Sequence, residues 1–135
     1  MVTYGEFIKL IVCTYVPVEK IIQLDGLHWA AGYVCTAELY GLMPQKTVML
    51  DELDLPITRM NMVKILAIID GNVSSKNYTK KKELDFIDIG HLPSFYLEYL
   101  DRVVNKGYIL GNPDKTFKPE SYLSRAEMVT ILTRL

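Results

Sequence analysis

Two arginines in this sequence occupy positions well suited to recognising a carboxylate. Arg59 and Arg125 each follow a hydroxyl residue that can cap a helix, Thr58 in one case and Ser124 in the other. The first turn of a helix has free backbone N–H groups and the positive end of the helix dipole, so it favours anions. A guanidinium there adds bidentate hydrogen bonding. The alternative is structural, with each arginine pairing with a neighbouring carboxylate of the protein.

The two arginines lie in two copies of a longer pattern, 66 residues apart. The first copy is marked by Trp29, Tyr33, Gly41, Thr58, Arg59, Met62 and Leu66, and the second by Phe95, Tyr99, Gly107, Ser124, Arg125, Met128 and Leu132. A partial third copy covers residues 2–7, with Tyr4 where the others have arginine. Such self-similarity indicates a small unit used several times, each too small to bury its own apolar face. We therefore expect function at the seams between units.

The spacing of apolar residues predicts an all-α domain of about six helices with little or no sheet. The expected helices cover residues 3–16, 28–41, 58–69, 93–106 and 124–135. Thr3 with Glu6, and Ser124 with Glu127, have the spacing of capping boxes. Phe7, Leu10, Ile11 and Thr14 are expected to form the buried stripe of the first helix, and Asp70-Gly71 to end the third.

Residues 71–85 are polar and charged, which indicates an inserted linker. Their basic run, residues 79–83, is expected to be a solvated face. With this segment set apart, the predicted organisation is a single domain with a partial repeat at 1–19, a second repeat at 20–70, the linker at 71–85 and a third repeat at 86–135.

Composition excludes several functional classes. The chain has 135 residues, half of them hydrophobic, which is enough for one domain with a real core. A net charge of -1 argues against nucleic-acid binding. No apolar run reaches the roughly 18 residues of a membrane span. Residues 7–16 are expected to be a helix of the mature domain rather than a signal peptide. Because Met1 directly precedes a repeat fragment, we expect these residues to be a piece of a longer protein.

Cys13 and Cys35 both lie in apolar helical patterns and are expected to be small buried hydrophobic residues. A disulfide between them is the second reading, and a metal site with His28 and His91 is the third. No Cys-x-x-Cys or His-x-x-x-His spacing supports the metal site, so no metal and no cofactor are expected.

An enzyme is not expected from the acidic residues Asp51, Glu52 and Asp54. Paired carboxylates can cleave glycosides, but the pair needs surroundings that raise one pKa and lower the other. The loop of residues 42–56 has no such pattern, which favours a solvated acidic loop. Neither a phosphate-binding glycine loop nor a nucleophile elbow occurs in the sequence.

The last 50 residues resemble an S-layer homology repeat in four signals that occur in order. These are Phe86-Ile87-Asp88, the aromatic helix of residues 95–107, the turn-rich loop of residues 111–119, and Ser124-Arg125-Ala126-Glu127. The copy at residues 20–70 resembles the family less, because Met60-Asn61 replaces Ala-Glu and the loop of residues 42–56 has lost the Gly-x-Pro-Asp pattern. The partial copy at residues 1–19 is only a final helix.

This resemblance implies a fold and a function. Such repeats typically work in threes, forming a pseudo-threefold helical assembly that anchors bacterial proteins to the cell wall. They bind secondary cell-wall polysaccharide, often pyruvylated and therefore acidic, in grooves between repeats. The resemblance thus implies an extracellular location at the cell surface. One lobe is incomplete here, unless a second copy of the chain (a homodimer) or a preceding segment completes it.

The resemblance and the residue chemistry together nominate five glycan-binding residues: Arg125, Arg59, Trp29, Gly111 and Glu127. The arginines would bind the acidic group, and Gly111 would let a sugar approach the backbone closely. Trp29 could pack against a sugar ring, although its helical stripe favours a core position. Glu127 is first a helix cap and second a ligand contact.

Three other residues are given supporting or negative roles. Phe95 lacks the indole N–H and is expected to pack, and Asp88 is expected to satisfy a neighbouring helix end. Tyr4 has no charge, so the first groove is expected to be inactive. The expected function is non-catalytic cell-wall anchoring. The alternative is a degenerate scaffold for protein–protein interaction or a structural role without glycan binding, which Tyr4, Asn61 and the altered loop favour.

Overall fold

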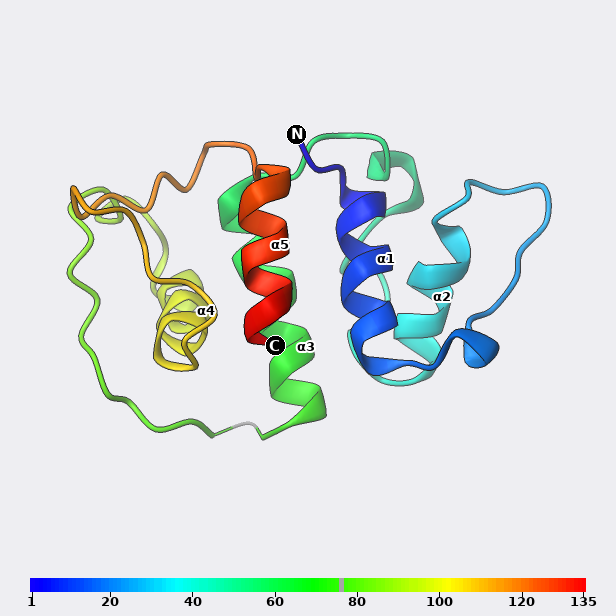
Figure 1. Ribbon diagram of the computed structural model, residues 1–135, viewed down its shortest axis with the longest axis horizontal. Coiled ribbons are helices and arrows are strands. Elements are labelled where there is room, and N and C mark those ends of the chain that lie inside the picture. The colour runs from blue at the N-terminus through cyan, green and yellow to red at the C-terminus, as the bar shows by residue number, and fades with distance from the viewer. Residues whose placement is uncertain (76) are drawn as a thin grey trace.

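The computed structural model describes residues 1–75 and 77–135 as a helical protein, and the expected all-α class is confirmed (Figure 1). The helices are α1 (Tyr4–Tyr15), α2 (Ala31–Leu39), α3 (Arg59–Val73), α4 (Ser94–Asn105) and α5 (Arg125–Arg134), with single 3₁₀ turns at Val18–Lys20 and Leu50–Glu52. Within the described ranges, extended pairing is limited to isolated bridges between Thr3 and Pro56 and between Thr58 and Tyr122. None of the helices in these ranges combines the length and the hydropathy that a bilayer span requires.

Helices α1, α3 and α5 lie at the centre of the molecule, with α2 and α4 at opposite ends (Figure 1). Helix α2 packs against α1, and α4 packs against α3, while α1 also contacts α5. The outer helix of each copy therefore covers the central helix of the copy before it. Because every unit relies on its neighbour for burial, the seams are part of one continuous core.

The N-terminal ends of the central helices are joined by a closed cycle of backbone hydrogen bonds. The N–H of Val2 donates to Leu123 at 3.0 Å, Leu123 to Ile57 at 2.9 Å, and Ile57 to Val2 at 2.9 Å. Each residue directly precedes an N-cap, and the three predicted caps are confirmed, with full capping boxes at Thr3 and Ser124. The cycle makes the three helix starts equivalent. A pseudo-threefold arrangement of complete repeats stays a prediction.

The buried stripe of α1 differs from the predicted one. Phe7 and Ile11 are buried as expected, together with Ile8 and Val12, but Leu10 and Thr14 are exposed. The physical reason is that α1 packs on two sides, against α2 and against α5, so its apolar face is broader and centred elsewhere.

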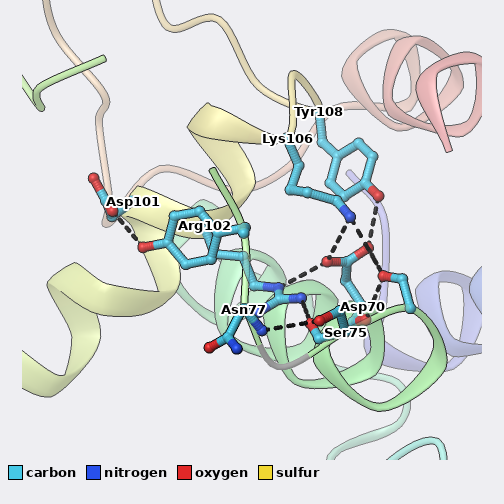
Figure 2. Close-up of polar contacts among 9 residues, drawn as sticks. Asp70, Ser75, Asn77, Asp101, Arg102, Lys106 and Tyr108 are labelled. Carbon is cyan, nitrogen blue, oxygen red and sulfur yellow. Dashed lines mark hydrogen bonds and ion pairs between the residues drawn. The ribbon is translucent and has the colours of Figure 1, made fainter. Parts of the chain in front are cut away.

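Helix α3 continues through Asp70-Gly71 to Val73, so its predicted end was wrong. Asp70 is buried and accepts hydrogen bonds from Arg102 Nε at 2.7 Å and the Tyr108 hydroxyl at 2.6 Å. Figure 2 shows this cluster, in which side chains from α4 and the segment after it point at the end of α3. The Arg102 guanidinium packs over Gly71, where a Cβ would make ordinary van der Waals contact with it at 3.7 Å. A tertiary contact thus overrides the local turn signal.

The polar segment after α3 is attached to α4. Asn105 Oδ1 accepts from the N–H groups of Lys81 and Lys82 at 2.6 and 2.8 Å, and the Tyr78 hydroxyl donates to Asp101. Lys81 and Lys82 are exposed residues, which agrees with the predicted solvated face. Lys76, which belongs to the predicted linker, lies outside the described residues.

Helix α2 is shorter than predicted, and its two flanking aromatic residues are exposed. It excludes Trp29, which is 54% exposed, and Tyr40, so the expected core position of Trp29 was wrong. The His28 ring nitrogen Nδ1 accepts from the N–H of Ala30, which holds a turn in front of the helix. Both cysteines are free, and the expected burial was wrong for Cys13, which is exposed.

Candidate functional site

The first helical residue of each central helix contacts the third helical residue of the next, giving three side-chain clasps. Tyr4 of α1 contacts Asn61 of α3. Arg59 of α3 contacts Glu127 of α5. Arg125 of α5 contacts Glu6 of α1, with 3.7 Å between Nη2 and Oε2. These clasps lie at the seams where function was expected, but they differ in charge and in exposure.

Arg59 is buried and pairs with a carboxylate of the protein, which is the structural role that the sequence analysis gave as the alternative to ligand binding. It is 8% exposed, its Nε donates to the Phe117 carbonyl at 2.7 Å, and its guanidinium lies 4.9 Å from the centre of the Phe117 ring. Its Nη1 forms an ion pair with Glu127. Burial lowers the pKa of Arg59, while the nearby Tyr96 and Asp88 oppose this effect. The arginine therefore joins three segments and has little freedom to reorient toward a ligand.

The backbone N–H groups at the start of α3 are also occupied. Those of Arg59 and Met60 donate to the carbonyls of Ser121 and Pro119 at 2.8 and 2.9 Å. The start of α1 is satisfied in the same way, by the carbonyls of Leu55 and Leu53. The free N–H groups that were expected to bind an anion are therefore not available at the starts of α1 and α3. Carbonyl groups in the connector of the following copy already accept their hydrogen bonds.

Arg125 differs from Arg59 in being open to solvent. Its side chain is 80% exposed, and its contact with Glu6 is at the long limit for an ion pair. An exposed pair of this kind contributes little to stability. Its guanidinium is consequently available to a ligand.

Tyr4 and Asn61 form a neutral clasp, and the two departures from the repeat pattern compensate each other. The Asn61 side-chain amide donates to the Tyr4 hydroxyl at 2.5 Å. Desolvation by burial and the nearby Glu52 raise the pKa of Tyr4, so the hydroxyl stays protonated at neutral pH. A hydroxyl and an amide therefore replace the arginine and the carboxylate together, which leaves no unpaired charge at a half-buried seam.

Three of the five nominated residues line one groove, which we call the α5 groove. It has a volume of about 330 Å³. Its lining residues are Arg59, Met62, Tyr108, Ile109, Leu110, Gly111, Asn112, Ala126, Glu127, Thr130, Ile131 and Arg134. Gly111 has φ of +82°, and a Cβ there would lie 2.3 Å from the Phe86 ring. Only glycine fits this turn, so its role in shaping the loop is clear from the geometry.

Trp29 lines a second groove, which we call the α1 groove, with a volume of about 510 Å³. It is lined by Thr3, Glu6, Lys9, Leu10, Trp29 and Asp54. The Lys9 ammonium lies 6.0 Å from the centre of the indole ring. Asp54 is engaged by His28 Nε2 at 2.7 Å, and Glu6 accepts the N–H of Thr3 as a cap. Among the described residues Lys9 has no carboxylate partner, so the groove holds a cation beside an exposed aromatic ring.

The two grooves use the same helical positions. The third, sixth and seventh residues of α1 line one, and the third, sixth and seventh of α5 line the other. The sequence analysis did not identify Lys9, the cation of the α1 groove, or Arg134, which lines the α5 groove together with Arg59. The position of Lys9 one turn after Glu6, on the polar side of an apolar helix, was a signal that could have found it.

Two supporting roles were assigned wrongly. Phe95 was expected to pack but is 62% exposed, because it lies in the first turn of α4, as Trp29 lies just before α2. Asp88 holds a loop rather than a helix end, accepting the N–H groups of Phe117 and Lys118 at 2.8 Å each. Desolvation raises the pKa of Asp88, but these hydrogen bonds outweigh it and leave the pKa below its usual value. Glu127 is confirmed as a cap, with reciprocal bonds to Ser124.

Comparison with known proteins gives concordant matches. The family model of the S-layer homology domain matches residues 86–129. The chain is 34% identical over 122 residues to the cellulosome-anchoring protein of Acetivibrio thermocellus, covering 83% of this chain and 25% of that protein. It is 31% identical over 122 residues to cell surface glycoprotein 1 of the same organism, covering 83% of this chain and 5% of the relative. The chain thus spans a quarter or less of these relatives.

Proposed function

Because residues 86–129 are an S-layer homology domain, we propose that this chain is a non-catalytic module that anchors a protein to the bacterial cell wall by binding an acidic wall polysaccharide. The observation that carries the proposal is the α1 groove, where Lys9, without a carboxylate partner in the described structure, stands beside the exposed Trp29. The names of both relatives concern anchoring or the cell surface, which supports a location outside the cell.

The α1 groove has the chemistry that an acidic sugar requires. The apolar face of an indole packs against the C–H face of a sugar ring, and its N–H is a polar handle. Lys9 supplies a positive charge at the same place. Arg125 lies next to the groove, because it contacts Glu6, which is one of the lining residues. An exposed guanidinium binds a carboxylate in two-point fashion, which suits a pyruvyl group. We assign Trp29, Lys9 and Arg125 to this groove as ligand contacts.

The α5 groove is the second place for the glycan. Gly111 and Asn112 line it, with the Asn112 side-chain amide donating to the carbonyl and hydroxyl of Thr116, and Arg134 adds a cation to the lining. Arg59 and Glu127 both line the groove and neutralise each other, so we assign them to shaping it and not to charge recognition.

The test is co-sedimentation of the folded chain with purified Gram-positive cell walls, before and after chemical removal of the secondary polysaccharide. We expect the chain to sediment with intact walls and to remain in solution with stripped walls. If it binds intact and stripped walls equally, or binds walls from none of several sources, the glycan proposal is wrong. The degenerate scaffold, favoured by the neutral Tyr4–Asn61 clasp, then becomes the better account.

A further inference from the structure

A polar cleft lies where the segment after α3 contacts the C-terminal end of α4. It has a volume of about 360 Å³ and shares no lining residue with the α1 groove or the α5 groove. The residues that line it are Asn77, Tyr78, Thr79, Lys81, Asn105 and Lys106. Two of these are lysines, and none of the described residues in the lining is a carboxylate. We call this cavity the strap cleft, and residues 77–82 the strap.

One side chain of α4 fixes the strap. Asn105 Oδ1 accepts from the N–H groups of Lys81 and Lys82 at 2.6 and 2.8 Å. Asn105 Nδ2 donates to the carbonyls of Lys82 and Asp101 at 3.2 and 2.9 Å. Both ends of the amide are therefore used to hold the strap. The backbone that carries Lys81 is in place before any ligand binds.

Lys106 is held by a buried carboxylate that a second cation also contacts. Its Nζ lies 3.6 Å from Asp70 Oδ2 (Figure 2) and donates to Ser74 Oγ at 3.3 Å. Asp70 is only 1% exposed, and the same oxygen accepts from Arg102 Nε at 2.7 Å. One carboxylate thus faces two cations, which leaves positive charge in excess beside the strap cleft.

Lys81 adds a further positive charge that the described residues do not balance. The neighbouring Lys80 pairs with Glu83 at 3.4 Å and with Asp101 at 3.7 Å. In the part of the chain that the structure describes, no carboxylate lies within ion-pair distance of Lys81. The strap cleft therefore brings together one anchored cation and one cation without a partner of opposite charge.

The cleft is not a general consequence of the repeated fold. The 66-residue offset places Leu39 where the last copy has Asn105, and Tyr40 where it has Lys106. Both residues of the earlier copy are exposed, Leu39 by 70% and Tyr40 by 48%. The earlier copy thus lacks the side chain that holds the strap and the cation beside it.

A phosphate group matches the chemistry of the strap cleft better than a carboxylate does. A phosphate ester carries close to two negative charges at neutral pH and has three strong acceptor oxygens. Lysine binds phosphate as a point charge. The exposed Asn77 amide and Thr79 hydroxyl supply neutral donors at the same cleft. Its volume of about 360 Å³ exceeds that of a phosphate group, so it has room for part of the molecule that carries the phosphate.

We propose that the strap cleft binds the phosphate group of a phosphorylated ligand. Lys81 and Lys106 neutralise the charge of the phosphate, and Asn77 and Thr79 donate hydrogen bonds to its oxygens. Asn105 is a positioning residue, because it holds the strap and does not touch the ligand. The site lies apart from the α1 and α5 grooves, so it does not depend on glycan binding there.

The first test is a titration of the isotopically labelled chain with inorganic phosphate, followed by NMR at constant ionic strength and slightly alkaline pH. We expect saturable shifts of the amide signals of Asn77, Thr79 and Lys81. Lys81→Gln should weaken phosphate binding by at least about fivefold. Lys82→Gln is the matched control, since it removes the same charge from an adjacent exposed residue outside the lining, and it should change binding by less than about twofold. Equal effects of the two substitutions would overturn the proposal.

Lys106→Gln tests the second cation, with thermal unfolding as the check that the variant is folded, because Lys106 also contacts Asp70. It should weaken phosphate binding to a degree similar to Lys81→Gln. Phosphate binding that is unchanged in both variants would overturn the proposal.

Three further probes identify the kind of ligand. Tighter binding of glycerol 1-phosphate than of inorganic phosphate would support a phosphomonoester on a small molecule. Tighter binding of glycerophosphoglycerol would support a phosphodiester of a polymer. Acetate is the control anion, and it should bind at least about fivefold more weakly than inorganic phosphate because it carries one charge and two acceptor oxygens. Acetate binding as tight as phosphate binding would overturn the assignment of the cleft to phosphate.

Discussion

The side-chain amide of Asn61 donates a 2.5 Å hydrogen bond to the hydroxyl of Tyr4, at a seam whose two counterparts hold an arginine and a carboxylate. The three contacts occupy the same helical positions, but one is a neutral hydrogen bond and two are ion pairs. The neutral contact still joins two helices, although it carries no charge. Substitutions at each contact can therefore distinguish its contribution to stability from a contribution to ligand binding.

Exchanging the neutral clasp for a charged one should work only when both residues change. Tyr4→Arg alone places a cation at a buried position opposite a neutral amide and should destabilise the protein by about 2 kcal/mol. Tyr4→Arg with Asn61→Glu restores the Arg59–Glu127 type of pair and should recover at least about 1 kcal/mol of that loss. Urea unfolding of the four proteins of the cycle measures the coupling. Strict additivity would contradict the compensation.

Arg59→Ala should destabilise the fold. The substitution removes a buried ion pair with Glu127 and the hydrogen bond to the Phe117 carbonyl. Because Glu127 is partly exposed, we expect about 2 kcal/mol, less than a fully buried pair would lose. Chemical denaturation measures the loss. An unchanged unfolding midpoint would argue that the clasp is not structural.

Arg125→Ala should separate binding from stability. Its side chain is largely exposed and its contact with Glu6 is long, so the free energy of unfolding should change by less than about 0.5 kcal/mol. Binding to cell walls should weaken, because the available guanidinium is lost. Co-sedimentation measures binding and thermal unfolding provides the control. Unchanged binding would remove Arg125 from the site.

Trp29→Ala should weaken wall binding, and Phe95→Ala is its matched control. Both aromatic residues are exposed and lie 66 residues apart at equivalent places, but only Trp29 lines the α1 groove with Lys9. We expect a loss of about tenfold in affinity for Trp29→Ala, equal to about 1.4 kcal/mol, with little change for Phe95→Ala. Equal effects of the two substitutions would argue against the α1 groove.

Asp70 should make stability depend on pH. Desolvation raises its pKa, but hydrogen bonds from Tyr108 and Arg102 and the charges of Lys106 and Arg102 outweigh it and lower the pKa below 3.8 (Figure 2). A carboxylate with a lowered pKa in the folded state stabilises fully above its unfolded pKa, and this contribution is lost as pH falls through the folded pKa. The stability difference between the native protein and Asp70→Asn should therefore shrink below about pH 4. A constant difference from pH 7 to pH 2 would contradict this assignment.

Local signals in the sequence determined the helical class and the helix starts. Thr3, Thr58 and Ser124 cap helices because a hydroxyl can reach an N–H two or three residues ahead, whatever the surroundings. The 66-residue offset likewise identified residues that turn out to be equivalent, such as Arg59 and Arg125. A capping bond depends on four adjacent residues, so sequence alone is sufficient to predict it.

Only the tertiary structure decided what the equivalent residues do. Arg59 is buried because Phe117 and Glu127 fold over it, whereas Arg125 has only Glu6 nearby and stays exposed. Asp70 continues a helix instead of ending it because Arg102 and Tyr108 satisfy its carboxylate from 32 and 38 residues away. These outcomes depend on which distant segment covers a position, and burial by a distant segment leaves no signal in the neighbouring residues.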